Sequence, residues 1–142
     1  MYRATGRLVA APWMLTRLAE TYARVGRLSE GLSCLADARQ MIERTEAQYA
    51  EADVYRLRGD ILNVTGDRVA AEQSYHQALA VAERQSAKLL ELRTATNLAR
   101  LWRDQGRGDD AHALLAPIYG WFTEGFDTPV LQDAKVLLDQ LV

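Results

Sequence analysis

The sequence lacks the features that mark disulfide-bonded, metal-caged or membrane-spanning proteins. Its 142 residues include one cysteine, Cys34, which excludes an intramolecular disulfide framework and a metal cage built from cysteines alone. No apolar run approaches the roughly 18 to 20 residues that a membrane-spanning helix needs. The apolar run at 8–11 is also too short for a signal-peptide core. We therefore expect a soluble, cytoplasmic protein that does not bind a membrane.

An excess of positive charge is also lacking. The 17 Lys and Arg residues are matched by 19 Asp and Glu, which gives a formal net charge of −2. A general nucleic-acid-binding protein would carry a basic surplus, so nucleic acid is not an expected partner. The 49% of hydrophobic residues are enough to build the core of one domain.

The chain does contain an internal repeat. Gly26, Gly66 and Gly106 recur every 40 residues, and an amphipathic helical pattern runs up to each glycine and starts again after it. Glycine suits these positions because it adopts the left-handed conformation that ends a helix. The pattern predicts a single domain with an N-terminal extension at 1–12 and three helix-turn-helix units within 13–127, at about 13–48, 51–87 and 89–124.

Short polar residues follow the glycines, and we expect Ser29, Asp67 and Asp109 to cap the second helix of each unit. The dipeptide Thr128-Pro129 predicts the start of a last helix, at 128–142, that covers the third unit.

The N-terminal end has no comparable cover. The first unit is therefore expected to expose apolar side chains that include Trp13 and Leu18. Either the chain is a piece of a longer protein, or it forms a homodimer through this N-terminal face, as an exposed apolar patch allows.

The three units resemble the tetratricopeptide repeat, although the usual period is about 34 residues. The residues that carry the resemblance are Leu15, Leu18, Ala19, Tyr22, Gly26, Gly31, Leu35 and Ala38 in the first unit, Tyr55, Gly59, Leu62, Gly66, Ala71, Tyr75 and Ala78 in the second, and Ala95, Leu98, Ala99, Trp102, Gly106, Ala111 and Leu115 in the third. Arg58 departs from the pattern, because leucine is usual at its position. The resemblance covers about 13–125 and implies an all-α, right-handed solenoid with a C-terminal capping helix.

A narrower resemblance is to the C-terminal helical repeats of large bacterial signalling proteins. It rests on the segments at 55–62, 98–107 and 119–141. Those proteins carry a cyclase-like or DNA-binding module and an ATPase ahead of the repeats. This chain has no G-x-x-x-x-G-K phosphate loop, so the resemblance implies a sensing or docking role with no cofactor.

The family's spacing places a partner-binding groove on the first helix of each unit. The groove residues that it implies are Trp13, Thr16, Glu20, Asp53, Arg56, Asp60, Asn63, Arg93, Thr96, Arg100 and Arg103. Arg93, Arg100 and Arg103 lie on nearby turns of one helix and suit a carboxylate or phosphate on a partner. The alternative is a solvated helix face, with Asp60 and Asp104 balancing the charge.

No catalytic or metal-binding pattern is present. His76, His112 and Cys34 have neither the H-E-x-x-H nor the C-x-x-C spacing, and we interpret them as packing or surface residues. We expect a non-catalytic scaffold that binds a peptide or protein segment in its groove. The alternative is a sensor that binds a small molecule between repeats, which needs a closed apolar pocket with a few polar groups.

Overall fold

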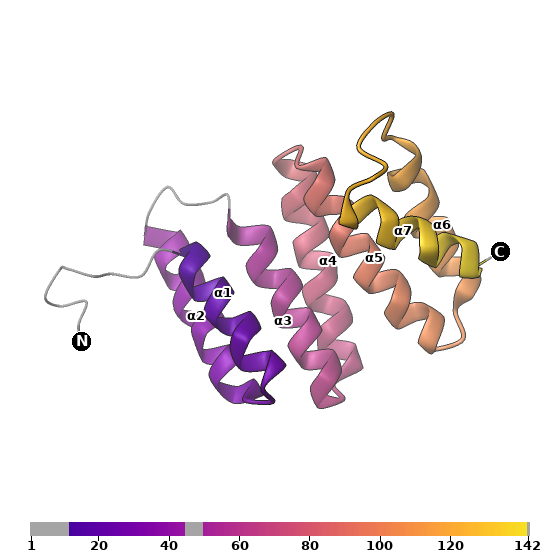
Figure 1. Ribbon diagram of the computed structural model, residues 1–142. Helices are drawn as coiled ribbons and strands as arrows, with labels where there is room; N and C mark the ends of the chain where they lie inside the picture. The colour runs from indigo at the N-terminus through magenta and orange to yellow at the C-terminus, as the bar shows by residue number, and fades with distance from the viewer. Residues whose placement is uncertain (1–11, 45–49, 142) are drawn as a thin grey trace, which may run out of the picture.

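The computed structural model of the chain describes residues 12–44 and 50–141, without the side chains at 12, 13, 43 and 44. This part contains helices and no strand, which confirms the predicted all-α fold. The helices are α1 (Pro12–Arg24), α2 (Leu28–Arg44), α3 (Glu51–Thr65), α4 (Arg68–Arg84), α5 (Lys88–Asp104), α6 (Gly108–Gly120) and α7 (Pro129–Leu141) (Figure 1). Across the described residues, every helix is too short or too polar to span a bilayer.

The helices pair through the glycine turns. Gly26, Gly66 and Gly106 have φ angles of +83°, +97° and +79°, which is the left-handed region that glycine tolerates at a helix end. Each turn is short, so the two helices that it joins lie antiparallel and pack against each other. The three pairs stack side by side as an array (Figure 1).

One of the three predicted helix caps is present. Asp67 is the N-cap of α4, and its side chain accepts a hydrogen bond of 3.1 Å from the backbone nitrogen of Ala70. The predictions for Ser29 and Asp109 are wrong, because α2 begins before Ser29 and α6 begins before Asp109. Arg107 occupies the N-cap position of α6 and makes no side-chain capping bond.

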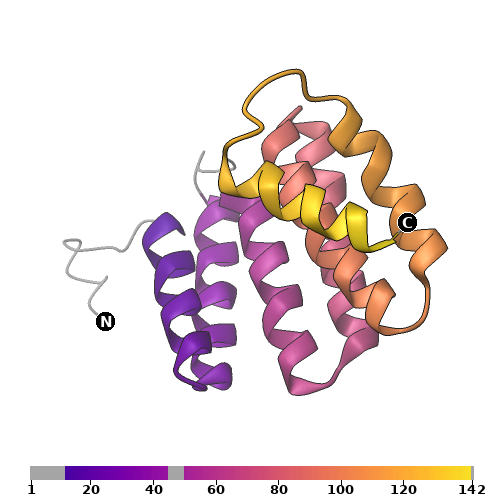
Figure 2. The ribbon, with the colours of Figure 1, turned by 45° about the vertical axis from the view of Figure 1, so that its right-hand side comes forward.

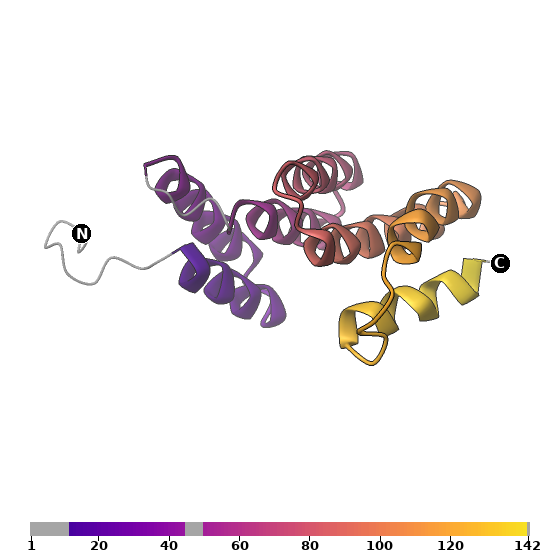
Figure 3. The same cartoon turned by 90° about the horizontal axis from the view of Figure 1, so that it is seen from above.

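The array has two layers, with α1, α3 and α5 in one and α2, α4 and α6 in the other (Figure 3). The last helix, α7, crosses the end of the array and packs on α5 and α6 (Figure 2). Leu131, Ala134 and Leu137 of α7 join the core of the third unit and are at most 2% exposed. The capping helix that was predicted from Thr128-Pro129 is therefore present, and it begins at Pro129.

The core of the second unit contains a smaller and a larger residue at two positions where the other two units have alanine and leucine. The first and third units hold an alanine and a leucine at the positions where the second unit has Gly59 and Tyr75. The pairs are Ala19 with Leu35 and Ala99 with Leu115, all at most 1% exposed. A Cβ atom on Gly59 would lie 2.6 Å from Cε1 of Tyr75, so the glycine makes room for the ring. This exchange carries the Tyr75 hydroxyl across the core toward α3.

Candidate functional site

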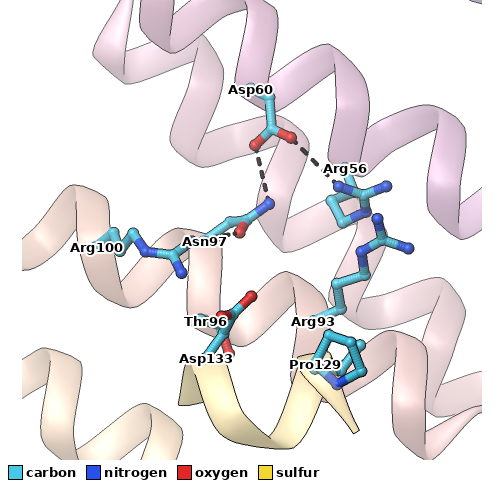
Figure 4. Close-up of a pocket in the computed structure, with 9 residues that line it drawn as sticks. Arg56, Asp60, Arg93, Thr96, Asn97, Arg100, Pro129 and Asp133 are labelled. Atoms are coloured by element: carbon cyan, nitrogen blue, oxygen red, sulfur yellow. Dashed lines mark hydrogen bonds and ion pairs between the residues drawn. The ribbon is translucent and has the colours of Figure 1, made fainter. Parts of the chain in front are cut away.

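A hollow of about 450 Å³ lies between α3, α5 and α7. We call it the α3–α5–α7 hollow. Figure 4 shows its lining: Arg56 and Asp60 from α3, Arg93, Thr96, Asn97 and Arg100 from α5, and Pro129, Val130 and Asp133 from α7. Five of the predicted groove residues thus meet at one place, because α3 and α5 lie in the same layer and α7 closes one side.

Asp60 is the most heavily bonded carboxylate of this hollow. It accepts hydrogen bonds from the Tyr75 hydroxyl at 2.5 Å, from Nδ2 of Asn97 at 3.0 Å and from Nη1 of Arg56 at 3.3 Å. Its side chain is 36% exposed, so water reaches it through the hollow. Burial raises the pKa of Asp60, and the Tyr75 hydrogen bond and the nearby guanidinium groups only partly oppose that shift.

Arg56 is held between two carboxylates. Its side chain is 5% exposed, and its Nε atom lies 3.1 Å from Oδ1 of Asp53 while its Nη1 atom binds Asp60. A buried guanidinium needs such partners because an unpaired buried charge is costly. Arg56 and Asp53 therefore form a fixed part of the wall.

The contact with Asp60 also changes the pKa of Tyr75. Burial and the neighbouring carboxylate raise the pKa of Tyr75 well above its ordinary value, so the hydroxyl stays protonated and acts as a hydrogen-bond donor. The ring is 2% exposed, which fixes the donor in place. Asp60 is thus positioned by groups from α4 and α5 as well as from its own helix.

Arg93 and Arg100 contribute two positive charges to the wall of the α3–α5–α7 hollow. They are seven residues apart and lie on one face of α5. Neither guanidinium forms an ion pair with a carboxylate of the described residues, although both are close enough to lower the pKa of Asp60. Nη1 of Arg100 donates to Oδ1 of Asn97 at 3.1 Å. Positive charge is therefore available to a ligand on this side of the hollow.

Arg103, unlike Arg93 and Arg100, forms an ion pair with a carboxylate. Its Nη2 atom lies 3.1 Å from Oδ1 of Asp104, and its Nη1 atom donates to Oε1 of Gln140 at 2.7 Å. It borders a smaller depression of about 140 Å³ between α5 and α7. The predicted balance of charge by Asp104 thus applies to Arg103 and not to Arg93 or Arg100.

The remaining predicted residues lie outside the α3–α5–α7 hollow. Glu20 lines a depression of about 180 Å³ between α1 and α3 that also reaches Asp60, and it pairs with Arg17 at 3.4 Å. Thr16 is 6% exposed and offers little surface to a partner, while Asn63 is half-buried on α3. The side chain of Trp13 lies outside the described residues.

Sequence reasoning missed four residues that line the hollow. Asn97 follows the predicted Thr96 directly, but its contact with Asp60 joins helices of different units. Pro129, Val130 and Asp133 lie on the helix that was predicted only as a cover. No sequence signal could have found them, because their position depends on how α7 crosses α5.

The residues weighed for catalysis are separated from one another and from this hollow. Nε2 of His76 lies 3.5 Å from Oε2 of Glu72 on the surface of α4, His112 is exposed on α6, and Cys34 is half-buried on α2. Burial raises the pKa of the Cys34 thiol. Within residues 12–44 and 50–141, the structure brings together no group of three or more side chains that suits a metal ion.

The third unit matches a known family. Residues 92–117, which cover most of α5 and α6, match the model of the tetratricopeptide repeat. No curated protein matches the chain significantly. The match supports the tetratricopeptide interpretation, and such repeats generally mediate protein–protein interaction and are generally non-catalytic scaffolds.

Proposed function

We propose that this protein is a non-catalytic scaffold that holds an acidic peptide or protein segment against the α3–α5–α7 hollow. We also propose a sensing or docking role for the scaffold, which is what the resemblance of its repeats to those of bacterial signalling proteins implies. The observation that carries the proposal is the pair of guanidinium groups, Arg93 and Arg100, that line the hollow without a carboxylate partner among the described residues.

The arrangement suits a carboxylate of the ligand. Arginine can bind a carboxylate in a bidentate geometry, with two parallel hydrogen bonds, and its charge-assisted hydrogen bonds are stronger than neutral ones. Arg93 and Arg100 are about two helical turns apart, so an extended segment with two acidic side chains could engage both.

The hollow also offers negative charge. Asp133 of α7 forms no ion pair with a described residue, and it lies across the hollow from Asp60 (Figure 4). A ligand with a basic group beside its acidic ones would satisfy both sides. The mixed lining therefore favours a polar segment over an apolar helix.

The first test measures binding of fluorescently labelled acidic peptides by anisotropy. We expect the chain to bind peptides rich in Asp and Glu, and to bind the matched Asn and Gln peptides at least tenfold more weakly. The double variant R93A/R100A should lose at least tenfold in affinity, because two charge-assisted contacts of about 1.5 to 3 kcal/mol each disappear.

A matched control removes positive charge elsewhere. Arg68 is exposed on α4, in the other layer, and R68A lowers the net charge without touching the hollow. The proposal is overturned if R68A weakens binding as much as a single change at Arg93 or Arg100, or if the neutral peptides bind equally well.

A small-molecule sensor is the second candidate, and the size of the hollow favours it. A volume of about 450 Å³ lies within the roughly 300 to 1,000 Å³ of small-molecule sites. The lining is largely polar and charged, however, whereas such sites are mostly apolar. Screening small dicarboxylates by thermal shift tests this candidate, and stabilisation that disappears in R93A/R100A would favour it over the peptide.

A further inference from the structure

A second hollow lies between the first and second units, on the other side of α3. It has a volume of about 560 Å³ and is lined by Arg39 of α2, Arg58 of α3, and Gln73, His76 and Gln77 of α4. We call it the α2–α3–α4 hollow. Arg58 is two residues from both Arg56 and Asp60, so it points to the opposite face of α3 from those two side chains.

The fold does not require polar residues at this place, as a comparison with the next interface of the array shows. The residues 40 positions later surround the equivalent place between the second and third units, and all are apolar. They are Leu79, Leu98, Ala113, Ala116 and Pro117. Leu79 and Leu98 belong to the buried core there, at 7% and 0% exposed. At this place in the repeat, two core leucines and three other apolar residues of the second interface are thus replaced by five polar side chains around an open space in the first.

Arg58 is held in position by a buried hydroxyl group. Its Nη1 atom lies 2.6 Å from Oγ of Ser74, which is 0% exposed. Arg58 and Ser74 occupy the positions that Leu98 and Leu114 occupy in the third unit. A guanidinium group and the hydroxyl group that binds it therefore stand where the third unit has two apolar side chains. A sequence that breaks its own local pattern in this way often does so at a functional site.

The positive charge of the hollow is not neutralised by its lining. None of the five lining residues is acidic, and neither Arg39 nor Arg58 forms an ion pair with a carboxylate of the described residues. Arg39 lies over the ring of Tyr55, 5.3 Å from its centre. Glu72 approaches His76 at 3.5 Å, but it is also bound by Arg107 at 3.4 Å.

We propose that the α2–α3–α4 hollow binds a phosphate group. A phosphate monoester has three terminal oxygens and nearly two negative charges at neutral pH. Two guanidinium groups from different helices, two side-chain amides one helical turn apart and an imidazole supply the matching donors. A single carboxylate has two oxygens and one charge, so it would leave most of these donors unused.

The test is a titration with inorganic phosphate and with a phosphoserine peptide, followed by the NMR signals of the Arg58 Nε–H and of the Gln73 and Gln77 amides. We expect saturable shifts with both probes and none with acetate at the same ionic strength. If the peptide binds more tightly than phosphate, the source is a phosphorylated protein segment. Equal affinity indicates a free phosphate or a small phosphorylated molecule.

The decisive variant is R58L, which installs the residue found at the equivalent positions Leu18 and Leu98 and should therefore fold. We expect it to weaken phosphate binding about tenfold or more, since a charged hydrogen bond is lost. R39L, which copies Leu79, should have a similar effect, while R68L should not. R100A should leave phosphate binding unchanged, which separates this site from the α3–α5–α7 hollow. Absence of saturable shifts, equal binding of acetate, or unchanged binding by R58L would overturn the proposal.

Discussion

Replacing Gly59 with alanine should destabilise the protein, although alanine is the better helix former. The new methyl group would lie 2.6 Å from Cε1 and 2.7 Å from Cδ1 of Tyr75, and that ring is buried and bonded to Asp60. Overpacking of this kind costs about 1 to 3 kcal/mol, while the gain in helix propensity is about 0.5 to 1 kcal/mol. The middle values of these two ranges differ by about 1 kcal/mol, so we expect the free energy of unfolding to fall by roughly that amount.

The other units supply the variant that tests this reasoning. G59A/Y75L recreates the alanine and leucine pair of the first and third units. Y75L alone leaves a cavity beside Gly59 and should cost about 2 to 4 kcal/mol. The double variant should be less destabilised than the sum of the two single variants by about 1 to 3 kcal/mol, because the added methyl group and the smaller side chain compensate.

Urea denaturation followed by far-ultraviolet circular dichroism measures all three variants against the parent protein. Gly120 is the control, because it ends α6 with open space where a Cβ would be, so G120A should change stability by less than about 0.5 kcal/mol. A G59A protein as stable as the parent, or additive effects in the double variant, would refute the volume exchange between Gly59 and Tyr75.

Three further changes test other parts of the structure. D67A should cost about 0.5 to 2 kcal/mol in urea denaturation, because the backbone nitrogen of Ala70 loses its cap, and an unchanged midpoint would contradict that role. Asp60 has a folded-state pKa above its ordinary value of 3.8, so the folded protein binds more protons than the unfolded chain above that pH. The stability of the parent relative to D60N should therefore fall as pH rises through this window, and a rise would show that the carboxylate is net stabilised. Leu18 and Met14 of α1 are 43% and 46% exposed, and we predict a dimer through this face. Light scattering across a dilution series should show L18D as the 15.9 kDa monomer, and a parent that is already monomeric would exclude the dimer.

The sequence alone determined the helices and their order. The glycine at the end of each first helix and the apolar spacing around it are local properties, so the 40-residue period was visible without any knowledge of packing. The same locality explains why the capping helix was predicted, because the preference of proline for the first position of a helix is a local property. The family's spacing then placed five residues on the wall of one hollow.

Tertiary structure decided which of those charges are available to a ligand. Arg56 and Arg100 looked alike in the sequence, yet Arg56 is buried between two carboxylates, whereas Arg100 donates to an amide side chain and forms no ion pair with a carboxylate of the described residues. Side-chain pairing depends on neighbours from other helices, and a helical pattern does not contain them. Asp133 lines the same hollow because α7 crosses α5, and that crossing is set by the packing of the two helices.

The polar hollow between the first two units was also decided by tertiary structure. Arg39, Arg58 and His76 come from three helices, and nothing in their spacing along the chain shows that they surround one space. The sequence did show that Arg58 breaks the repeat pattern. Only the folded array shows what replaces the missing leucine, because packing between units is the part of a solenoid that the period leaves free to vary.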